Sequence, residues 1–293
     1  MICSIVGRCL DSCGSPAESL PFQGFIRMAD TQLQMLVVGE GARRRRIACL
    51  SEPGSHTGLL WLAGLNSQMT GTKASALAQW ARANGMGCVR FDYSGHGQSE
   101  GRLEGGTIGG WLAEARAVFC RLSQGPQILV GSSMGGYLAL LLLRDLLLEA
   151  PEEGLRICGL VLVAPAWNMT ELIWQRLSPS ARKEIEEKGL FLRPSRYGDG
   201  PYPITRSLIE EGRGHLIAPF DPGRPVHILH GHKDPDVPFA HTLELVATLS
   251  GGWARVWAVP DGEHRLSRPQ DLSLLINIVA SLNASPPFPR KRR

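Results

Sequence analysis

The chain has 293 residues, of which 43% are hydrophobic, and its formal net charge at pH 7 is +4. This length and composition can bury a substantial core and allow one or two domains. The positive excess is small, and no basic stripe interleaved with aromatic side chains points to a nucleic-acid partner. We therefore expect a globular protein that does not bind nucleic acid.

The cysteines and the hydropathy indicate in which cellular compartment this protein is expected. The seven cysteines are an odd number and form neither a CxxC pair nor a metal-ligand spacing, which suits a reducing compartment. The longest apolar run, Leu138–Leu143, is broken by Arg144 and Asp145, so it is too short for an integral membrane segment. We expect a cytoplasmic protein.

Both ends of the chain lack a regular pattern. Residues 1–24 show no clear periodicity and predict a flexible N-terminal extension, so translation starts at either Met1 or Met28. Residues 285–293 are rich in proline and end in a basic tail, which cannot pack regularly. The folded domain is predicted to span residues 25–284.

Strands and helices alternate in the first half of the chain. Two apolar runs flank a Gly-Glu-Gly turn and predict a hairpin, and the later runs are typical of buried strands or amphipathic helices. The expected elements are a hairpin of Leu33–Val38 and Ile47–Leu50, strands at Leu59–Ala63 and Gly87–Phe91, and helices at Thr72–Asn84 and Thr107–Leu122.

The second half continues this alternation but is interrupted once. Strands are expected at Ile128–Val130, Ile157–Val163, Val226–His230 and Ala254–Val259, and helices after Ser133, at about Phe239–Leu249 and at Pro269–Leu282. Residues 167–224 contain no clear strand. Their helical patterns are Met169–Leu177, Pro179–Lys188 and Ile204–Glu211.

This rhythm predicts an α/β fold with eight strands. Strand–helix alternation favours a mostly parallel sheet covered by helices on both faces, with the opening hairpin at one edge. The insertion at about 167–224 follows the sixth strand, so it is predicted to form a helical cap on the side where that strand ends.

A serine stands at the sharp turn between a strand and a helix. Ser133 is flanked by Gly131 and Gly135, and Gly-x-Ser-x-Gly in this setting is the nucleophile elbow of α/β-hydrolases. The turn holds the serine in strained backbone geometry, so the positions two before and two after it must be small. Ser133 is therefore the candidate nucleophile.

A serine nucleophile needs a base and a carboxylate, which on this fold follow it in the order acid, then histidine. The loop after Val226–His230 offers Asp234 or Asp236, and the loop after Ala254–Val259 offers His264. We prefer Asp234 as the acid because it comes first after the strand. Asp236 is the alternative.

Three other histidines are interpreted as structural. His230 and His232 precede the acid and cannot fill the last position of the triad, although His230-x-His232-x-Asp234 has the alternation of a metal site. Pro235 stands where metallo-hydrolases continue with another histidine, so no metal or other cofactor is predicted. His96, in a Gly-rich loop, is expected to brace neighbouring loops.

Ester chemistry at a serine also needs two N–H donors for the oxyanion. The amide after the nucleophile, that of Met134, is one candidate. The other is the amide of Leu65 in the turn after Leu59–Ala63, where Gly64 leaves space for a carbonyl oxygen.

Six motifs together resemble one branch of the α/β-hydrolase superfamily. They are GLNSQMTGTKA (64–74), FDYSGHGQS (91–99), GSSMGG (131–136), SARKEIEEKG (180–189), LHGHKDPDVP (229–238) and EHR (263–265). The branch contains the mitochondrial acyl-glucuronide esterase and palmitoyl-protein thioesterase, with its bacterial homologues. The resemblance implies that Ser133, Asp234 and His264 hydrolyse an ester or thioester. Gln68 departs from the acidic residue that this branch often has there.

We therefore predict a serine hydrolase of carboxylic esters or acyl-thioesters, acting on a small molecule or an acyl-protein as a monomer or homodimer. The alternatives are a carbon–carbon hydrolase, perhydrolase or lyase with the same triad, and a non-catalytic binding module. Apolar residues of the cap that are available to line a pocket are Trp167, Trp174, Leu177, Phe191 and Tyr197.

Overall fold

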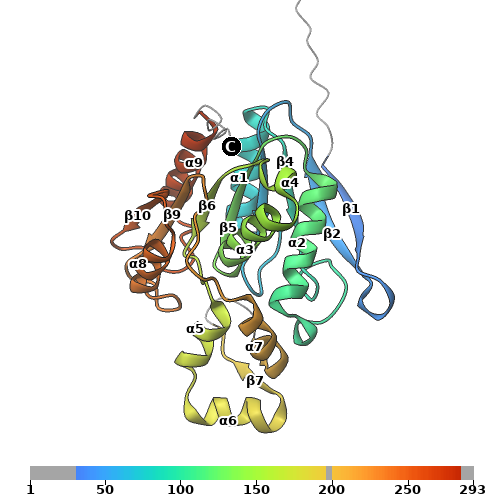
Figure 1. Cartoon of the computed structure of the whole chain (residues 1–293), viewed down its shortest axis with the longest axis vertical. Coiled ribbons are helices and arrows are strands. Elements are labelled where there is room, and N and C mark those ends of the chain that lie inside the picture. The colour runs from blue at the N-terminus through green and yellow to red at the C-terminus, as the bar shows by residue number, and fades with distance from the viewer. Residues whose placement is uncertain (1–30, 196–199, 285–293) are drawn as a thin grey trace, which may run out of the picture.

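The computed structural model describes residues 31–195 and 200–284, which are built around one eight-stranded sheet (Figure 1). In space the strands follow the order β1-β2-β4-β3-β5-β6-β9-β10. They are β1 (Gln32–Val38), β2 (Arg45–Glu52), β3 (Gly58–Leu62), β4 (Cys88–Phe91), β5 (Gln127–Ser132), β6 (Ile157–Val163), β9 (Val226–Gly231) and β10 (Ala254–Val259).

The sheet is antiparallel at one edge and parallel elsewhere. β1 pairs antiparallel with β2, and β2 antiparallel with β4. All pairs from β4 to β10 are parallel. The predicted fold class is confirmed, with the opening hairpin at the edge where the sequence placed it.

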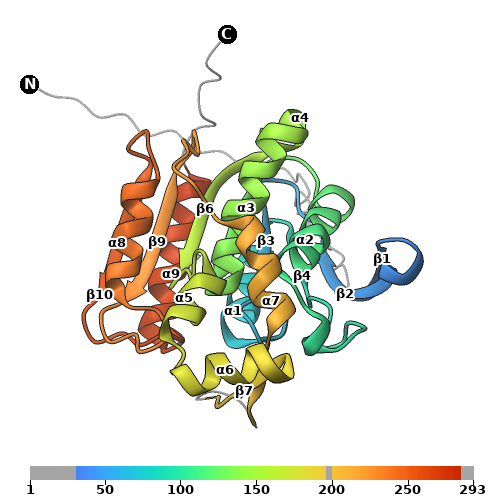
Figure 2. The same cartoon turned by 60° about the horizontal axis from the view of Figure 1, so that its bottom comes forward.

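Helices cover both faces of the sheet, so its central strands are buried on both sides and consist of nearly continuous apolar runs. α1 (Thr72–Ala83) and α9 (Pro269–Asn283) contact each other on one face, and α2 (Ile108–Leu122) and α3 (Met134–Glu149) do so on the other (Figure 2). α8 (Phe239–Thr248) packs beside β9. Residues 134–143 of α3 are all buried, which makes α3 the central helix of its layer.

Four short elements were not predicted, because three or four residues carry no periodic signal. These are the helix α4 (Pro151–Gly154) and the 3-10 turns η1 (Gly41–Arg43), η2 (Leu103–Gly105) and η3 (Arg213–His215). The main helices and strands lie within a few residues of their predicted bounds.

The chain between β6 and β9 forms a cap at the end of the sheet where the parallel strands finish (Figure 1). It contains α5 (Met169–Arg176), α6 (Pro179–Lys188), β7 (Leu190–Arg193), β8 (Tyr202–Thr205) and α7 (Arg206–Gly212). The expectation that this segment holds no strand is wrong, because β7 and β8 pair as an antiparallel ribbon. Each strand has only four residues and β8 includes Pro203, so neither shows an alternating pattern.

The third helix of the cap begins two residues later than predicted. Ile204 and Thr205 belong to β8, and the Thr205 side chain accepts a hydrogen bond from the Leu208 N–H at 3.1 Å. Threonine at this position caps the first turn of a helix, which fixes the start of α7 at Arg206.

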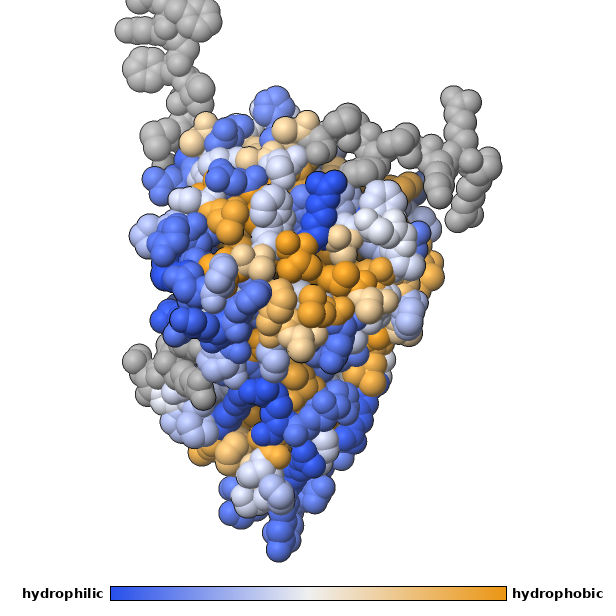
Figure 3. Space-filling model, turned by 90° about the vertical axis from the view of Figure 1, so that its left-hand side faces the viewer, coloured by the Kyte–Doolittle hydropathy of each residue, from blue (hydrophilic) through white to orange (hydrophobic). Residues whose placement is uncertain are grey.

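Strand β10 forms the other edge of the sheet and, among the described residues, pairs only with β9. Figure 3 faces this side of the molecule and shows hydrophobic surface among polar side chains. Trp257 of β10 and Leu243 of α8 are 38% and 54% exposed. The monomer-or-homodimer prediction stays a prediction.

Several predictions concern residues outside the described ranges. These are the extension 1–24, the alternative start at Met28, the tail 285–293 and Tyr197. Within the described ranges, no helix has both the length and the apolar character needed to cross a lipid bilayer.

Candidate active site

Ser133 lies between β5 and α3, and its backbone has a conformation that residues other than glycine rarely adopt. Its φ is +54° and its ψ is −116°, and its N–H donates to the Val163 carbonyl at 2.8 Å. A Cβ atom on Gly131 would overlap the Gly135 carbonyl, and one on Gly135 would overlap the Leu62 carbonyl. The two flanking glycines are therefore required by the close approach of backbone to backbone in this turn.

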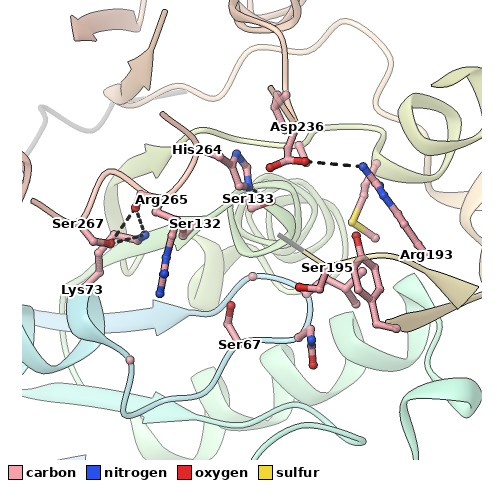
Figure 4. A pocket seen from close by; sticks show the side chains of 18 of the residues that line it. Ser67, Lys73, Ser132, Ser133, Arg193, Ser195, Asp236, His264, Arg265 and Ser267 are labelled. Carbon is pink, nitrogen blue, oxygen red and sulfur yellow. Dashed lines mark hydrogen bonds and ion pairs between the residues drawn. The ribbon is translucent and has the colours of Figure 1, made fainter. Parts of the chain in front are cut away.

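The three predicted triad residues follow the carboxyl ends of β5, β9 and β10, and Figure 4 shows two of them, Ser133 and His264, side by side in the cavity. His264 Nε2 lies 3.1 Å from Ser133 Oγ. His264 Nδ1 lies 2.7 Å from Asp234 Oδ2. The structure thus joins nucleophile, base and acid in one hydrogen-bonded chain, in the order that serine catalysis requires.

Asp234 is held by donors on both carboxylate oxygens. Oδ1 accepts the N–H groups of Asp236 and Val237, each at 2.8 Å, and Oδ2 accepts from His264 and His230. Burial acts to raise the pKa of this carboxyl group. The hydrogen bonds from His230 and His264 outweigh it, and the pKa lies well below its ordinary value. Asp234 is therefore ionised at neutral pH.

Asp236, the alternative acid, lies differently. Its carboxylate is 3.8 Å from the Arg193 guanidinium across the cavity (Figure 4). One of its oxygens lies within 4.8 Å of a ring nitrogen of His264. The contact with His264 Nδ1 belongs to Asp234, the acid that the sequence analysis preferred.

The three members of the His230-x-His232-x-Asp234 pattern do not share a metal-binding geometry. Among the described residues, the one group of such side chains close enough to hold an ion is Asp234, Asp236 and His264. Asp234 and His264 are already hydrogen-bonded to each other. His232 instead packs against Phe239, with ring centroids 4.2 Å apart.

The two predicted oxyanion donors flank the nucleophile. Met134 is the first residue of α3, where backbone N–H groups have no partner within the helix. Leu65 lines the cavity in the turn after β3, and a Cβ atom on Gly64 would lie 3.4 Å from Ser133 Cβ. The turn that carries Leu65 is therefore adjacent to the nucleophile.

His96 braces that turn, in line with its structural interpretation. The Asn66 N–H donates to His96 Nε2 at 3.0 Å, and His96 Nδ1 donates to the Ser94 carbonyl at 3.1 Å. Burial lowers the pKa of this imidazole, which favours the neutral form that can accept at Nε2.

A cavity of about 780 Å³ opens beside Ser133 and His264. Its apolar wall comes mainly from one side of α5 and the residue after it: Met169, Leu172, Ile173 and Leu177. Sequence analysis missed all of these except Leu177, although their spacing of three, one and four residues is that of one helix face.

Most of the other proposed lining residues lie elsewhere. Trp167 stacks on His241 with ring centroids 5.1 Å apart, and the guanidinium groups of Arg182 and Arg213 lie 5.6 Å and 5.7 Å from the ring centre of Trp174. Phe191 packs against the core.

The charged residues that line the cavity are mostly cationic. They are Lys73, Arg176, Arg193 and Arg265, with Asp236 as the one carboxylate among the described lining residues. Lys73 donates to the Arg265 carbonyl and to Ser267 Oγ, as Figure 4 shows. Burial lowers the Lys73 pKa from its ordinary 10.5 to about 8.

Known proteins resemble this chain over most of its length. A family model described as "Serine aminopeptidase, S33" matches residues 59–193. The human protein named palmitoyl-protein thioesterase ABHD10, mitochondrial, is 33% identical over 232 residues, which cover 78% of this chain and 74% of the relative.

Solved structures agree with this relationship. A crystal structure from Agrobacterium vitis S4 has a TM-score of 0.83 and 41% identity, and the match covers 86% of this chain and 99% of that one. The mouse alpha/beta hydrolase domain-containing protein 10 has a TM-score of 0.75 and 32% identity, over 86% of this chain and 98% of that chain.

Proposed function

The chain belongs to the α/β-hydrolase family that includes ABHD10, and we propose that it hydrolyses carboxylic esters or acyl-thioesters through an acyl-enzyme on Ser133. The observation that carries this proposal is the hydrogen-bonded chain from Ser133 through His264 to Asp234, at the floor of a large cavity. The family relationship supports hydrolase chemistry in general, and the triad geometry supports this mechanism in particular.

In the proposed reaction, His264 Nε2 takes the proton of Ser133 as Oγ attacks the acyl carbonyl. His264 then gives this proton to the leaving alcohol or thiol, and an acyl-enzyme remains. Water then gives a proton to the same nitrogen and attacks the acyl carbonyl. The bond to Ser133 Oγ breaks, His264 returns the proton to Oγ, and the carboxylic acid is released. Asp234 keeps the Nδ1–H tautomer of His264 oriented and stabilises the imidazolium that forms in each half-reaction.

The amides of Met134 and Leu65 are the proposed donors to the oxyanion. Each would donate to the carbonyl oxygen as it becomes negative, which is where such donors accelerate acyl transfer most. Gly64, which precedes Leu65, carries no side chain on the side that faces Ser133.

We propose that the acyl chain binds against the apolar wall of the cavity, which consists of Met169, Leu172, Ile173 and Leu177. Apolar acyl groups gain free energy by leaving water for such a surface. Because the curated relatives are named palmitoyl-protein thioesterases, long-chain acyl-thioesters belong among the first substrates to test.

The charges in the cavity oppose an aminopeptidase activity, although the matching family model is described by that name. An aminopeptidase must bind the positively charged N-terminus of its substrate. Four cations line this cavity, and its one described carboxylate, Asp236, is paired with Arg193. A substrate ammonium group would therefore be repelled, which favours ester or thioester substrates.

The test is covalent labelling by a fluorophosphonate, read by intact mass, on the wild type and on Ser133→Ala. One adduct on the wild type and none on the variant is the expected result. Rates with p-nitrophenyl esters and acyl-thioesters of increasing chain length would then define the substrate. An unlabelled but folded wild type would refute the acyl-enzyme mechanism.

A further inference from the structure

A second histidine contacts the carboxylate of the triad. His230 lies near the end of β9, and its side chain is fully buried. Its Nε2 lies 3.1 Å from Asp234 Oδ2 and 3.0 Å from the Val237 carbonyl oxygen. Its Nδ1 lies 2.6 Å from Thr242 Oγ1 on α8. Both ring nitrogens are therefore in hydrogen-bond contact.

The partners of His230 determine where its proton sits. Ionised Asp234 and the Val237 carbonyl can only accept, so Nε2 must carry a hydrogen. The Thr242 hydroxyl, 2.6 Å from Nδ1, is able to donate to that nitrogen. His230 therefore donates from Nε2 toward Asp234 while Thr242 holds the other side of the ring.

We propose that His230 is a positioning residue, which fixes the Asp234 carboxylate for His264 and moderates its charge. This inference rests on the proposed function. Oδ2 accepts from both histidines, while Oδ1 is held by two backbone amides. The carboxylate is thereby prevented from rotating, and part of its negative charge is used by a donor other than His264.

The charged groups around the hydrogen-bonded series His230–Asp234–His264 determine how activity should depend on pH. Asp234 faces His230 directly, and His264 lies on the other side of the shared oxygen. His241 on α8 is the titratable neighbour from the packed helix, and burial lowers its pKa. Asp236, within 4.8 Å of His264, is paired with Arg193 of the cap.

Without the His230 donor, the full charge of Asp234 acts on His264. This favours the imidazolium, so the acid limb of kcat/KM should move to higher pH. The orientation of the acid should also loosen, which lowers kcat by roughly tenfold. KM should stay near its wild-type value, because His230 does not line the cavity.

The test compares two amides of different reach at the same position. The His230→Gln variant places its N–H group near the Nε2 position, whereas the amide of His230→Asn is too short to reach Asp234. We expect wild-type behaviour from the first, and a lower kcat with a shifted acid limb from the second. Equal pH profiles for the two variants, or a wild-type kcat in His230→Asn, would overturn the proposal.

A matched control on the same strand separates positioning from packing. His227 of β9 is also buried, at 5% exposure, but has no contact with Asp234. His227→Asn should keep the wild-type acid limb, and a shift there equal to that of His230→Asn would contradict the proposal. Circular dichroism and thermal melting would confirm that each variant is folded.

Two further measurements keep the inference testable in every case. ¹⁵N NMR of the wild type should find a proton on His230 Nε2; a ring protonated on Nδ1 alone would overturn the proposal. Fluorophosphonate labelling of the wild type distinguishes failure of the proposed function from failure of the inference about His230. If Ser133 is labelled while His230→Asn behaves as wild type, the inference about His230 fails and the proposed function stands.

Discussion

Arg193 and Asp236 connect the cap to the loop of Asp234, the proposed catalytic acid. The guanidinium of Arg193, at the end of β7, lies 3.8 Å from the Asp236 carboxylate, which follows Asp234 by two residues. The same guanidinium lies 6.0 Å from the ring centre of Tyr202, its partner in β8. The Arg193 side chain thus contacts both the β7–β8 ribbon of the cap and the loop that carries Asp234.

Replacement of Arg193 by methionine should alter substrate binding more than stability. A partly exposed pair of this kind stabilises folding by about 1 kcal/mol or less. The cavity wall, however, loses its attachment, so KM should rise a few-fold. The uncompensated charge of Asp236 near His264 should also move the acid limb of kcat/KM to higher pH.

Steady-state kinetics between pH 5 and 9 would check this prediction for Arg193→Met. The control is Arg102→Met, since Arg102 forms an exposed pair with Glu104 and does not line the cavity. The same rise in KM in both variants would contradict the role given to Arg193.

Asp234→Asn and Asp236→Asn should differ by orders of magnitude in turnover. Asp234 Oδ2 lies 2.7 Å from His264 Nδ1, and an asparagine there no longer holds the correct tautomer. In a serine protease the equivalent change costs about 10⁴-fold in kcat, so we expect a loss of about three to four orders of magnitude. Asp236→Asn should lose less than about tenfold. Comparable losses, measured on a short-chain p-nitrophenyl ester, would refute Asp234 as the acid.

The elbow should not tolerate a single methyl group. Gly131→Ala would drive its Cβ into the Gly135 carbonyl, so we expect a destabilisation of more than about 3 kcal/mol or failure to fold. Gly105→Ala is the matched control, because a Cβ at this exposed turn meets nothing within 4 Å. That change should alter the free energy of unfolding by no more than about 1 kcal/mol. Urea titrations of the two variants provide the comparison.

Lys73 should make folding stability depend on alkaline pH. Its pKa in the folded state is about 8, below the 10.5 of an ordinary lysine, because burial disfavours the ammonium. The unfolded chain therefore binds more protons between these values, and stability rises with pH across this window. In Lys73→Met this rise, on the order of 1 kcal/mol, should disappear.

Urea unfolding at pH 7.5 and pH 10 would measure this difference. Lys183→Met serves as the control, since Lys183 is an exposed residue of α6 whose side chain is 71% accessible. A rise in stability with pH that persists in Lys73→Met would show that another group is responsible.

The features that were predicted correctly are those with local causes. The elbow needs a small residue two positions before and two positions after Ser133, and this pattern is visible within five consecutive residues of the sequence. The parallel strands are continuous apolar runs because both of their faces are covered. The order Ser133, Asp234, His264 along the chain then sufficed to propose which side chains meet.

The features that were missed depend on contacts between distant residues. Leu190–Arg193 becomes a strand only because Tyr202–Thr205 pairs with it. The role of His230 depends on Thr242, which lies on the following helix. The domain boundaries at 25 and 284, the cytoplasmic location and the oligomeric state stay predictions.

The order of the strands has a consequence for how this enzyme family can diversify. Ser133, Asp234 and His264 follow β5, β9 and β10, whereas the cap is inserted after β6, which lies between β5 and β9 and contributes no triad residue. Changes in the length or sequence of this insertion leave the three triad loops attached to the same sheet. If the proposed mechanism holds, new acyl preferences arise by changes in this one insertion, while the proposed triad is inherited unaltered.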